Sequence, residues 1–213
     1  MRFRALAGLV LLLGPLSPGL PAQEAGSRAF GVMGALTFSR FGGLDRDGYD
    51  RSRVWLTGGL FARFPLSPGL SLQPELLLAQ KGAKHEEPGF ASGVTITYVE
   101  VPVLLRLALP LRRPGLAITP HLYGGGAFGF KVRCRISFIS GVASSTQSCA
   151  DGGFPIKSTD LASMVGAGVD LGPATVGARY ELGLLNIGGD ASNRDLKNRT
   201  FLLLIGWTFR SPR

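Results

Sequence analysis

Hydrophobic and polar residues alternate with a period of two along most of the chain. In the segment YVEVPVLLRL at 98–107, Glu100 and Arg106 share one parity, and the other parity holds only valine and leucine. Successive side chains of a β-strand point to opposite faces, so such a segment predicts a strand with one polar and one apolar face. Eight segments of this kind predict eight strands, at about 29–38, 53–64, 70–81, 94–109, 116–131, 160–171, 174–187 and 199–209.

The gaps between these strands alternate between short and long. Proline- and glycine-rich turns occupy 65–69, 110–115 and Gly172-Pro173, whereas the other gaps are longer and more polar. Outer-membrane β-barrels have short periplasmic turns and longer extracellular loops in this order. The pattern therefore predicts an all-β, eight-stranded antiparallel up-and-down transmembrane barrel, and the even strand count places both termini on the periplasmic side. The four longer gaps cover 39–52, 84–93, 132–159 and 188–198.

Parity alone does not decide which face lies inside the barrel. A soluble barrel of the lipocalin kind would turn its apolar face inward. Several strands, however, carry glycines on the same face as their charges, which suits a crowded polar lumen, whereas a solvated face gains nothing from residues that weaken strands. We therefore expect the polar face to line the lumen. The residues that carry this argument are Gly166, Gly168, Asp170, Gly177, Arg179 and Gly183.

Charged residues of this polar face predict a network inside the barrel. Glu100 and Arg106 are expected to pair with charges from other strands, for which Glu75, Arg179 and Glu181 are the candidates. Eight strands leave an interior that side chains can just fill. We interpret these residues as structural rather than catalytic.

Three prolines and the last strand bear on the same prediction. Pro74, Pro102 and Pro120 fall inside predicted strands, where proline removes a ladder hydrogen bond, so they predict bulges or strand portions beyond the membrane. The last strand, RTFLLLIGWTF, ends with Trp207 and Phe209, as expected at an interfacial aromatic girdle.

The first residues have the layout of a secretory signal peptide. Arg2 and Arg4 precede an apolar stretch at 5–13 that is too short to span a bilayer. Cleavage is predicted after Ala22 or two to three residues later, which leaves 23–213 as one barrel domain. A retained amphipathic anchor is the alternative, but the stretch has no polar face.

An exported chain enters an oxidising compartment, where Cys134 and Cys149, the two cysteines, are expected to form a disulfide. The formal net charge of +9 falls to +7 when Arg2 and Arg4 are removed, since 1–22 holds no acidic residue. This excess suits anionic lipid headgroups as well as it suits ordinary solubility. Nucleic acid is not expected as a partner, because the chain is exported and has no clustered basic stripe.

Other motifs offer little chemistry. The segment at 124–129 fits G-x-G-x-x-G, but a dinucleotide fingerprint opens a helix, and this one lies within a predicted strand. His121 faces the predicted lumen and has no serine at short spacing. His85 lies in a predicted loop beside Glu86 and Glu87, where it is expected to be solvated. Three aspartates of the first long gap lack the remaining ligands of a calcium loop. We predict no catalytic, cofactor or metal site; the aspartates are Asp45, Asp47 and Asp50.

Five segments together resemble the outer-membrane β-barrel domain family of small bacterial porin-like proteins. The likeness covers nearly all of 29–209, and its most specific motifs are Gln-Pro-Glu before an apolar run and Glu-x-Pro with a basic residue downstream. The resemblance implies prolines inside the strands but no biochemical role. The segments are LSLQPELLLAQKG (70–82), YVEVPVLLRL (98–107), GAGVDLG (166–172), VGARYELGLLNI (176–187) and KNRTFLLLIGWTF (197–209).

The function predicted from these observations is that of a non-enzymatic barrel of the bacterial outer membrane. Its role would be structural or in surface interaction, with a small diffusion porin as the alternative and a lipid-modifying enzyme as a third class. The expected partners are outer-membrane lipids, lipopolysaccharide and, during assembly, the insertion machinery, with the protein a monomer.

Overall fold

The computed structural model describes residues 28–43, 51–109, 118–189 and 195–210, and these residues form strands and connecting segments. The predicted signal peptide and its cleavage site lie outside the described residues and stay predictions. The strands are β1 (Ala29–Gly42), β2 (Arg51–Ser67), β3 (Leu70–Glu87), β4 (Phe90–Ala108), β5 (Ile118–Ser140), β6 (Ala143–Ser148), β7 (Thr159–Leu171), β8 (Ala174–Gly183) and β9 (Lys197–Arg210).

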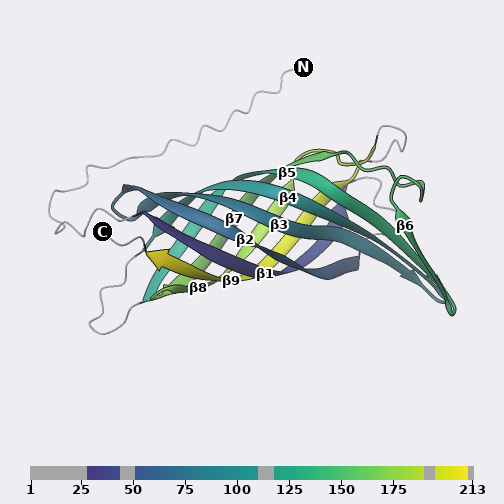
Figure 1. The fold of residues 1–213 in the computed structure, drawn as a ribbon, viewed down its shortest axis with the longest axis horizontal. Helices are drawn as coiled ribbons and strands as arrows, with labels where there is room; N and C mark the ends of the chain where they lie inside the picture. The colour runs from purple at the N-terminus through teal and green to yellow at the C-terminus, as the bar shows by residue number, and fades with distance from the viewer. Residues whose placement is uncertain (1–27, 44–50, 110–117, 190–194, 211–213) are drawn as a thin grey trace, which may run out of the picture.

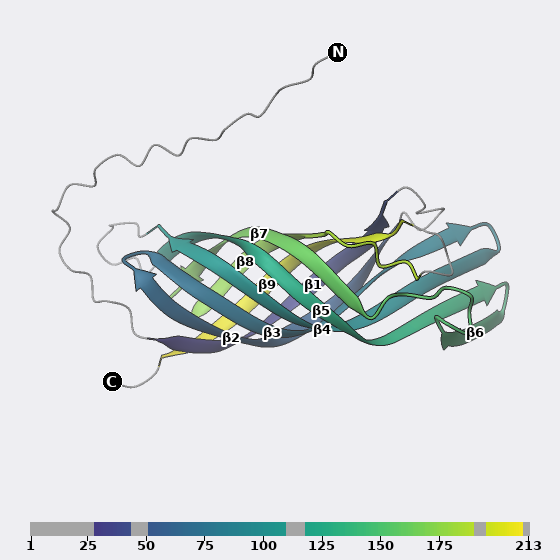
Figure 2. The ribbon, with the colours of Figure 1, turned by 90° about the horizontal axis from the view of Figure 1, so that it is seen from above.

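Eight of these strands close into a ring. Each pairs antiparallel with its neighbours in the order β1-β2-β3-β4-β5-β7-β8-β9, and β9 pairs back to β1. The predicted eight-stranded antiparallel barrel is thus confirmed. A ninth strand, β6, was not predicted; it pairs only with β5, as a hairpin outside the ring. Figures 1 and 2 show this hairpin at one end of the barrel, and the start of β1 and the arrowhead of β9 at the other.

The polar face lines the barrel interior and the apolar face is its outer wall. Glu100 is 2% exposed, whereas Val103 on the same strand is 47% exposed. The crowding expected from the glycines is present as well, because a Cβ on Gly166 would lie 2.5 Å from the ring of Tyr123. The inverted, lipocalin-like arrangement is therefore wrong for this chain.

The strands extend beyond their predicted ends on the side away from the termini. The predicted loop at 84–93 is a continuation of β3 and β4, which are joined by a two-residue turn in which Gly89 has a φ of +81°. Its polar composition hid the strand, since outside a membrane both faces of a hairpin can be polar. In this hairpin Lys84 hydrogen-bonds Glu86 at 2.7 Å and lowers the pKa of Glu86. Conversely, β8 ends at Gly183, four residues before its predicted end.

The strand prolines do not mark bulges. The pairing of β3 with β4 skips the residues around Pro102, but its register is the same on both sides of this gap, between Pro74 and Leu77. The expected bulge is thus wrong for Pro102, and the alternative of strand portions beyond the membrane stays a prediction. A register shift occurs instead between Thr97 and Tyr98 of β4, where β5 holds one extra residue, Val132.

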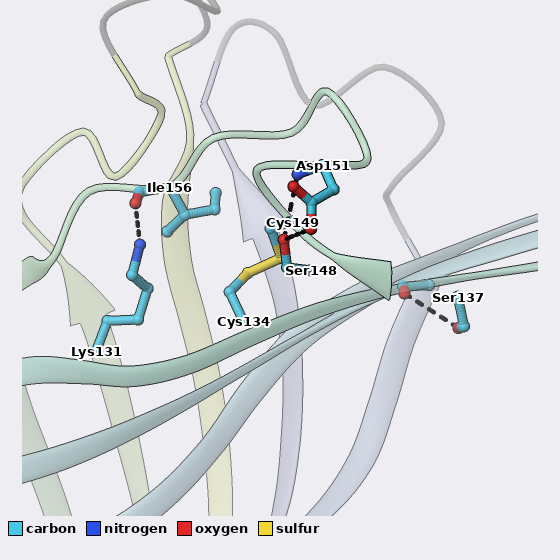
Figure 3. Close-up of a disulfide and its surroundings, with 8 residues drawn as sticks. Lys131, Cys134, Ser137, Ser148, Cys149, Asp151 and Ile156 are labelled. Atoms are coloured by element: carbon cyan, nitrogen blue, oxygen red, sulfur yellow. Dashed lines mark hydrogen bonds between the residues drawn. A yellow bond between two sulfur atoms is a disulfide. The ribbon is translucent and has the colours of Figure 1, made fainter. Parts of the chain in front are cut away.

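This extra residue reverses the parity of β5. Before Val132 along the strand, Tyr123 and other odd-numbered residues of β5 face the lumen. After it, toward the β5–β6 hairpin, Cys134 and Ile136 face inward and Arg133 outward. Cys134 is bonded to Cys149, as predicted, with 5.4 Å between the two Cα atoms. The bond joins β5 to the end of the β5–β6 hairpin (Figure 3).

The burial pattern predicts that a charge introduced at two outward positions of β4 destabilises the barrel by different amounts. Val103→Arg places a charge near the middle of the apolar wall and should lower the free energy of unfolding by about 2–4 kcal/mol, whereas Thr97→Arg should cost about 0–1 kcal/mol. Urea unfolding in phospholipid vesicles measures both. Equal costs would contradict the position of the apolar belt.

Candidate functional site: the barrel lumen and its outer cap

A bidentate ion pair crosses the lumen between β3 and β8. Arg179 donates from Nη1 and Nη2 to the two carboxylate oxygens of Glu75, at 2.7 and 2.8 Å. The two strands are not neighbours in the ring, so the bond spans the interior. Arg179 is 1% exposed and its guanidinium lies 5.0 Å from the centre of the Tyr123 ring. Gln73 donates to Glu75 at 2.8 Å and completes the carboxylate's hydrogen bonding.

A second group of charges surrounds Asp170 of β7. Arg106 of β4 forms a salt bridge with Asp170, again between strands that are not neighbours. Thr175 donates to the other carboxylate oxygen at 2.7 Å, and Arg63 lies 3.8 Å away. His121 places Nδ1 3.7 Å from Asp170, beyond hydrogen-bond distance.

The third group is centred on Lys81 of β3, which is 1% exposed. Its ammonium contacts the carboxylates of Glu100 on β4 and Glu181 on β8. Its nitrogen also lies 5.5 Å from the centre of the Tyr98 ring, a cation–π contact. One ammonium with three donors thus serves two buried carboxylates.

The five residues predicted for the lumen all point inward and are nearly inaccessible to solvent, but their partners differ from those expected. Glu100 and Arg106 do not pair with Glu75, Arg179 or Glu181 among the described residues; Lys81 and Asp170 are their partners. Parity could have found both, because Lys81 shares the parity of Glu75 and Asp170 that of Gly166 and Gly168. Asp170 was placed on the lumen face but was not considered as a partner, and Lys81 was not considered because it is the last residue of its predicted strand. The five are Glu75, Glu100, Arg106, Arg179 and Glu181.

Above these charges an apolar cluster, here called the outer cap, fills the barrel interior. It packs inward-facing residues of the strands against two connecting segments, 149–156 and 184–189, which are themselves joined by a bridge between Ile156 and Gly188. Lys131 of β5 also donates to the carbonyl of Ile156 (Figure 3). The outer cap consists of Phe41, Ala83, Val94, Ile96, Tyr98, Ile136, Cys149, Phe154, Ile156, Ile187 and Leu196.

The remaining sequence motifs fall on ordinary structural positions. The glycines at 124–129 lie within β5 and open no helix. His85 lies in the β3–β4 hairpin, 3.2 Å from Glu87, and His121 stacks on Tyr123. Among the described residues no group of histidine, cysteine or carboxylate side chains could hold a metal ion. The three aspartates considered for calcium, Asp45, Asp47 and Asp50, lie outside the described residues.

A closed antiparallel ring with an apolar outer wall and a polar, ion-paired interior defines a transmembrane β-barrel, since only closure leaves no strand edge unpaired in lipid. No described helix is long and apolar enough to cross a bilayer. A family model of the outer membrane protein beta-barrel domain matches residues 22–188. The chain belongs to this family, and it is a protein of the bacterial outer membrane.

Solved structures with this fold include three outer-membrane barrels at low identity. Ail of Yersinia pestis, in complex with the heparin analogue sucrose octasulfate, is 18% identical with a TM-score of 0.43, and covers 86% of this chain and 99% of its own. Neisserial surface protein A is 13% identical with a TM-score of 0.43, covering 84% and 97%. The barrel domain of Pseudomonas aeruginosa OprF is 12% identical with a TM-score of 0.35, covering 84% and 97%. No curated protein matches the chain.

The Glu75–Arg179 pair predicts a large difference between single and double substitutions. Arg179→Met leaves the Glu75 carboxylate buried without its partner and should lower the free energy of unfolding by about 3–5 kcal/mol. Glu75→Gln combined with Arg179→Met removes the uncompensated charge and should cost clearly less. Urea unfolding in vesicles compares the two, with Arg40→Met, an exposed position, as control. Equal losses for the single and double variants would show that the charge pair is not what the site depends on.

Proposed function

We propose that the protein is a non-enzymatic barrel of the outer membrane that does not conduct solutes and acts as a structural or surface-interaction component. The observation that carries this proposal is the occlusion of the interior by two layers in series. Ion pairs cross the lumen on the side of the termini, and the outer cap fills it on the other side. A cavity beside Arg179 and Tyr123 has a volume of about 20 Å³, room for about one water.

The lumen ion pairs are proposed to hold the barrel shut. Arg179–Glu75, Arg106–Asp170 and Lys81–Glu181 each join strands that are not adjacent in the ring. These three pairs therefore restrain the barrel's cross-section in a way that ladder hydrogen bonds between neighbours do not. The geometry offers little for catalysis, because His121 lies in the lumen against Tyr123 and Asp170, with no serine hydroxyl bonded to it among the described contacts.

A role in surface interaction is supported by the two hairpins that extend beyond the barrel, β3–β4 and β5–β6 (Figure 2). Large apolar side chains at their tips are exposed, namely Phe90, Ile139 and Val142. Such exposed apolar residues suit contact with another surface. Outer-membrane lipids and lipopolysaccharide surround the barrel in this proposal, the insertion machinery assembles it, and it acts as a monomer.

Occlusion in two layers predicts how the protein behaves in a planar lipid bilayer. The wild-type protein should give no stable conductance steps, and Glu75→Ala with Arg179→Ala should also give none, because the outer cap remains. Adding Phe154→Ala and Ile156→Ala to this variant should produce steps. Discrete steps from the wild type, with an ion selectivity that changes in the Glu75/Arg179 variant, would instead identify the protein as a diffusion porin.

A non-enzymatic role predicts no turnover of lipid. Radiolabelled lipid A incubated with the folded protein in vesicles should keep its full set of acyl chains, as judged by thin-layer chromatography, and His121→Ala should give the same result. Release of a labelled acyl chain by the wild type that is lost in His121→Ala would place the protein among the lipid-modifying barrels.

A further inference from the structure

The outward-facing side chains of β3, β4 and β5 change from apolar to polar between two adjacent rows of the sheet. Residues paired across the three strands form rows at one level of the barrel wall. In the last apolar row, Leu78 and Phe130 are both more than half exposed, as expected of residues that face lipid. The rows are Leu78–Val99–Phe130, then Gln80–Thr97–Arg133, then Gly82–Thr95–Arg135.

This boundary lies toward the turn that joins β3 to β4. That turn is at the end of the barrel away from the start of β1 and the arrowhead of β9 (Figures 1 and 2). With the termini on the periplasmic side, it is where the hydrocarbon of the outer leaflet meets its headgroups. Exposed side chains of Arg133 and Arg135 stand directly above Phe130 on the same strand.

At this level the wall is hollowed by a groove with a volume of about 310 Å³. Its charged residues are all basic, and the rest are polar or aromatic. Arginine is the side chain whose fork of donors matches a phosphate group. The groove is lined by Arg53, Trp55, Gln80, Thr95, Thr97, Arg133, Arg135, Ser137 and Thr146.

Arg53 and Trp55 reach the groove from β2 because of an irregularity in that strand. The pairing of β2 with β3 breaks off between Ser52 and Thr57, where the register shifts. The Arg53 side chain extends as far as β4, where a Cβ on Gly93 would lie 2.3 Å from its Nη1. Gly93 thus leaves the space that the guanidinium occupies, and the guanidinium lies 4.9 Å from the Trp55 ring centre.

Two donors in this groove are buried and unpaired. Arg53 Nη1 and Trp55 Nε1 have no hydrogen-bond acceptor among the described residues. Buried donors without partners are costly, and each asks for an explanation such as a ligand that supplies the acceptor.

The positive charge of the groove is also uncompensated. None of the salt bridges between described residues involves Arg53, Arg133 or Arg135. By contrast, Glu86 of β3 pairs with two nearby cations, Arg51 of β2 and Lys84 of β3. A groove with three arginines and two unpaired donors has the chemistry of an anion site.

We propose that this groove binds the phosphate group of an outer-leaflet glycolipid. The phosphate oxygens accept hydrogen bonds from the arginines and from Trp55 Nε1, and the acyl chains lie over the apolar row at Leu78, Val99 and Phe130. This apolar row directly below the cations favours a lipid over a phosphate ion in solution. The inference rests on the proposed function for the partner class and on the predicted orientation, with both termini on the periplasmic side.

Trp55 is a reporter placed inside the proposed site. The chain has two tryptophans, so Trp207→Phe leaves Trp55 as the single emitter. The full barrel in this background is reconstituted into phosphatidylcholine vesicles that contain increasing fractions of diphosphoryl lipid A. We expect a saturable change in Trp55 emission, and no such change with dephosphorylated lipid A or with inorganic phosphate at the same phosphate concentration.

Two variants test the site by different means. Arg133→Gln with Arg135→Gln removes charge-assisted hydrogen bonds and should raise the half-saturating fraction roughly tenfold or more. Gly93→Ala keeps every charge but displaces the Arg53 guanidinium, and should weaken binding as well. Arg40→Gln removes one exposed arginine of β1, outside the groove, and should leave the response within about twofold of the wild type, as expected of an exposed charge.

The proposal is overturned if the Arg133/Arg135 variant, shown to be folded by its heat-modifiable migration, responds like the wild type, or if Gly93→Ala has no effect. A change in Trp55 emission with inorganic phosphate but not with lipid A would show that the site binds a soluble anion, and would overturn the assignment of a lipid ligand. Bilayer conductance is measured separately, so a conducting barrel that still binds lipid A would overturn the proposed function and leave this site standing.

Discussion

Closure of the sheet is the constraint on which the rest of the structure depends. In hydrocarbon no water can satisfy a backbone N–H or C=O, so the pairing of β9 with β1 must leave no open edge. Closure then creates an inside that is too narrow for bulk water, and every inward side chain must find its partner there. The crossed ion pairs and the glycines packed against Tyr123 and His121 are both consequences of that narrowness.

Buried ion pairs are weak evidence for stability in a soluble protein, because desolvation offsets their attraction. In this barrel the alternatives are limited, since an interior apolar throughout would remove the difference between the two faces of each strand. Two kinds of side-chain packing accordingly fill the lumen at different levels along the barrel axis. Ion pairs and a smaller apolar cluster around Leu104, Tyr123 and Met164 occupy the part that lies within the membrane. A larger apolar core, the outer cap, forms where the strands rise beyond the membrane and connecting segments fold over them.

Much of this fold could be read from the sequence because the physical rule behind it is local. Parity identified the lumen face, including Glu100 and Arg106, and the short and long gaps gave the strand order. Partners could not be read, since which charge meets Arg106 depends on the barrel's stagger, a property of all strands together. The hairpin at 84–93 was missed because polar residues on both faces erase the alternation. The outer cap was missed because residues of connecting segments such as Phe154 and Ile156 carry no periodicity.

The single extra residue at Val132 has a consequence that reaches beyond its strand. By exchanging the faces of β5 halfway along, it turns a cysteine toward the interior and an arginine toward the surrounding leaflet in consecutive positions, Arg133 and Cys134. Both the disulfide that closes the β5–β6 hairpin and the outward position of Arg133 therefore depend on this one extra residue. A deletion of Val132 would turn Arg133 inward and Cys134 outward at the same time, whereas a substitution at either position changes only one of the two features.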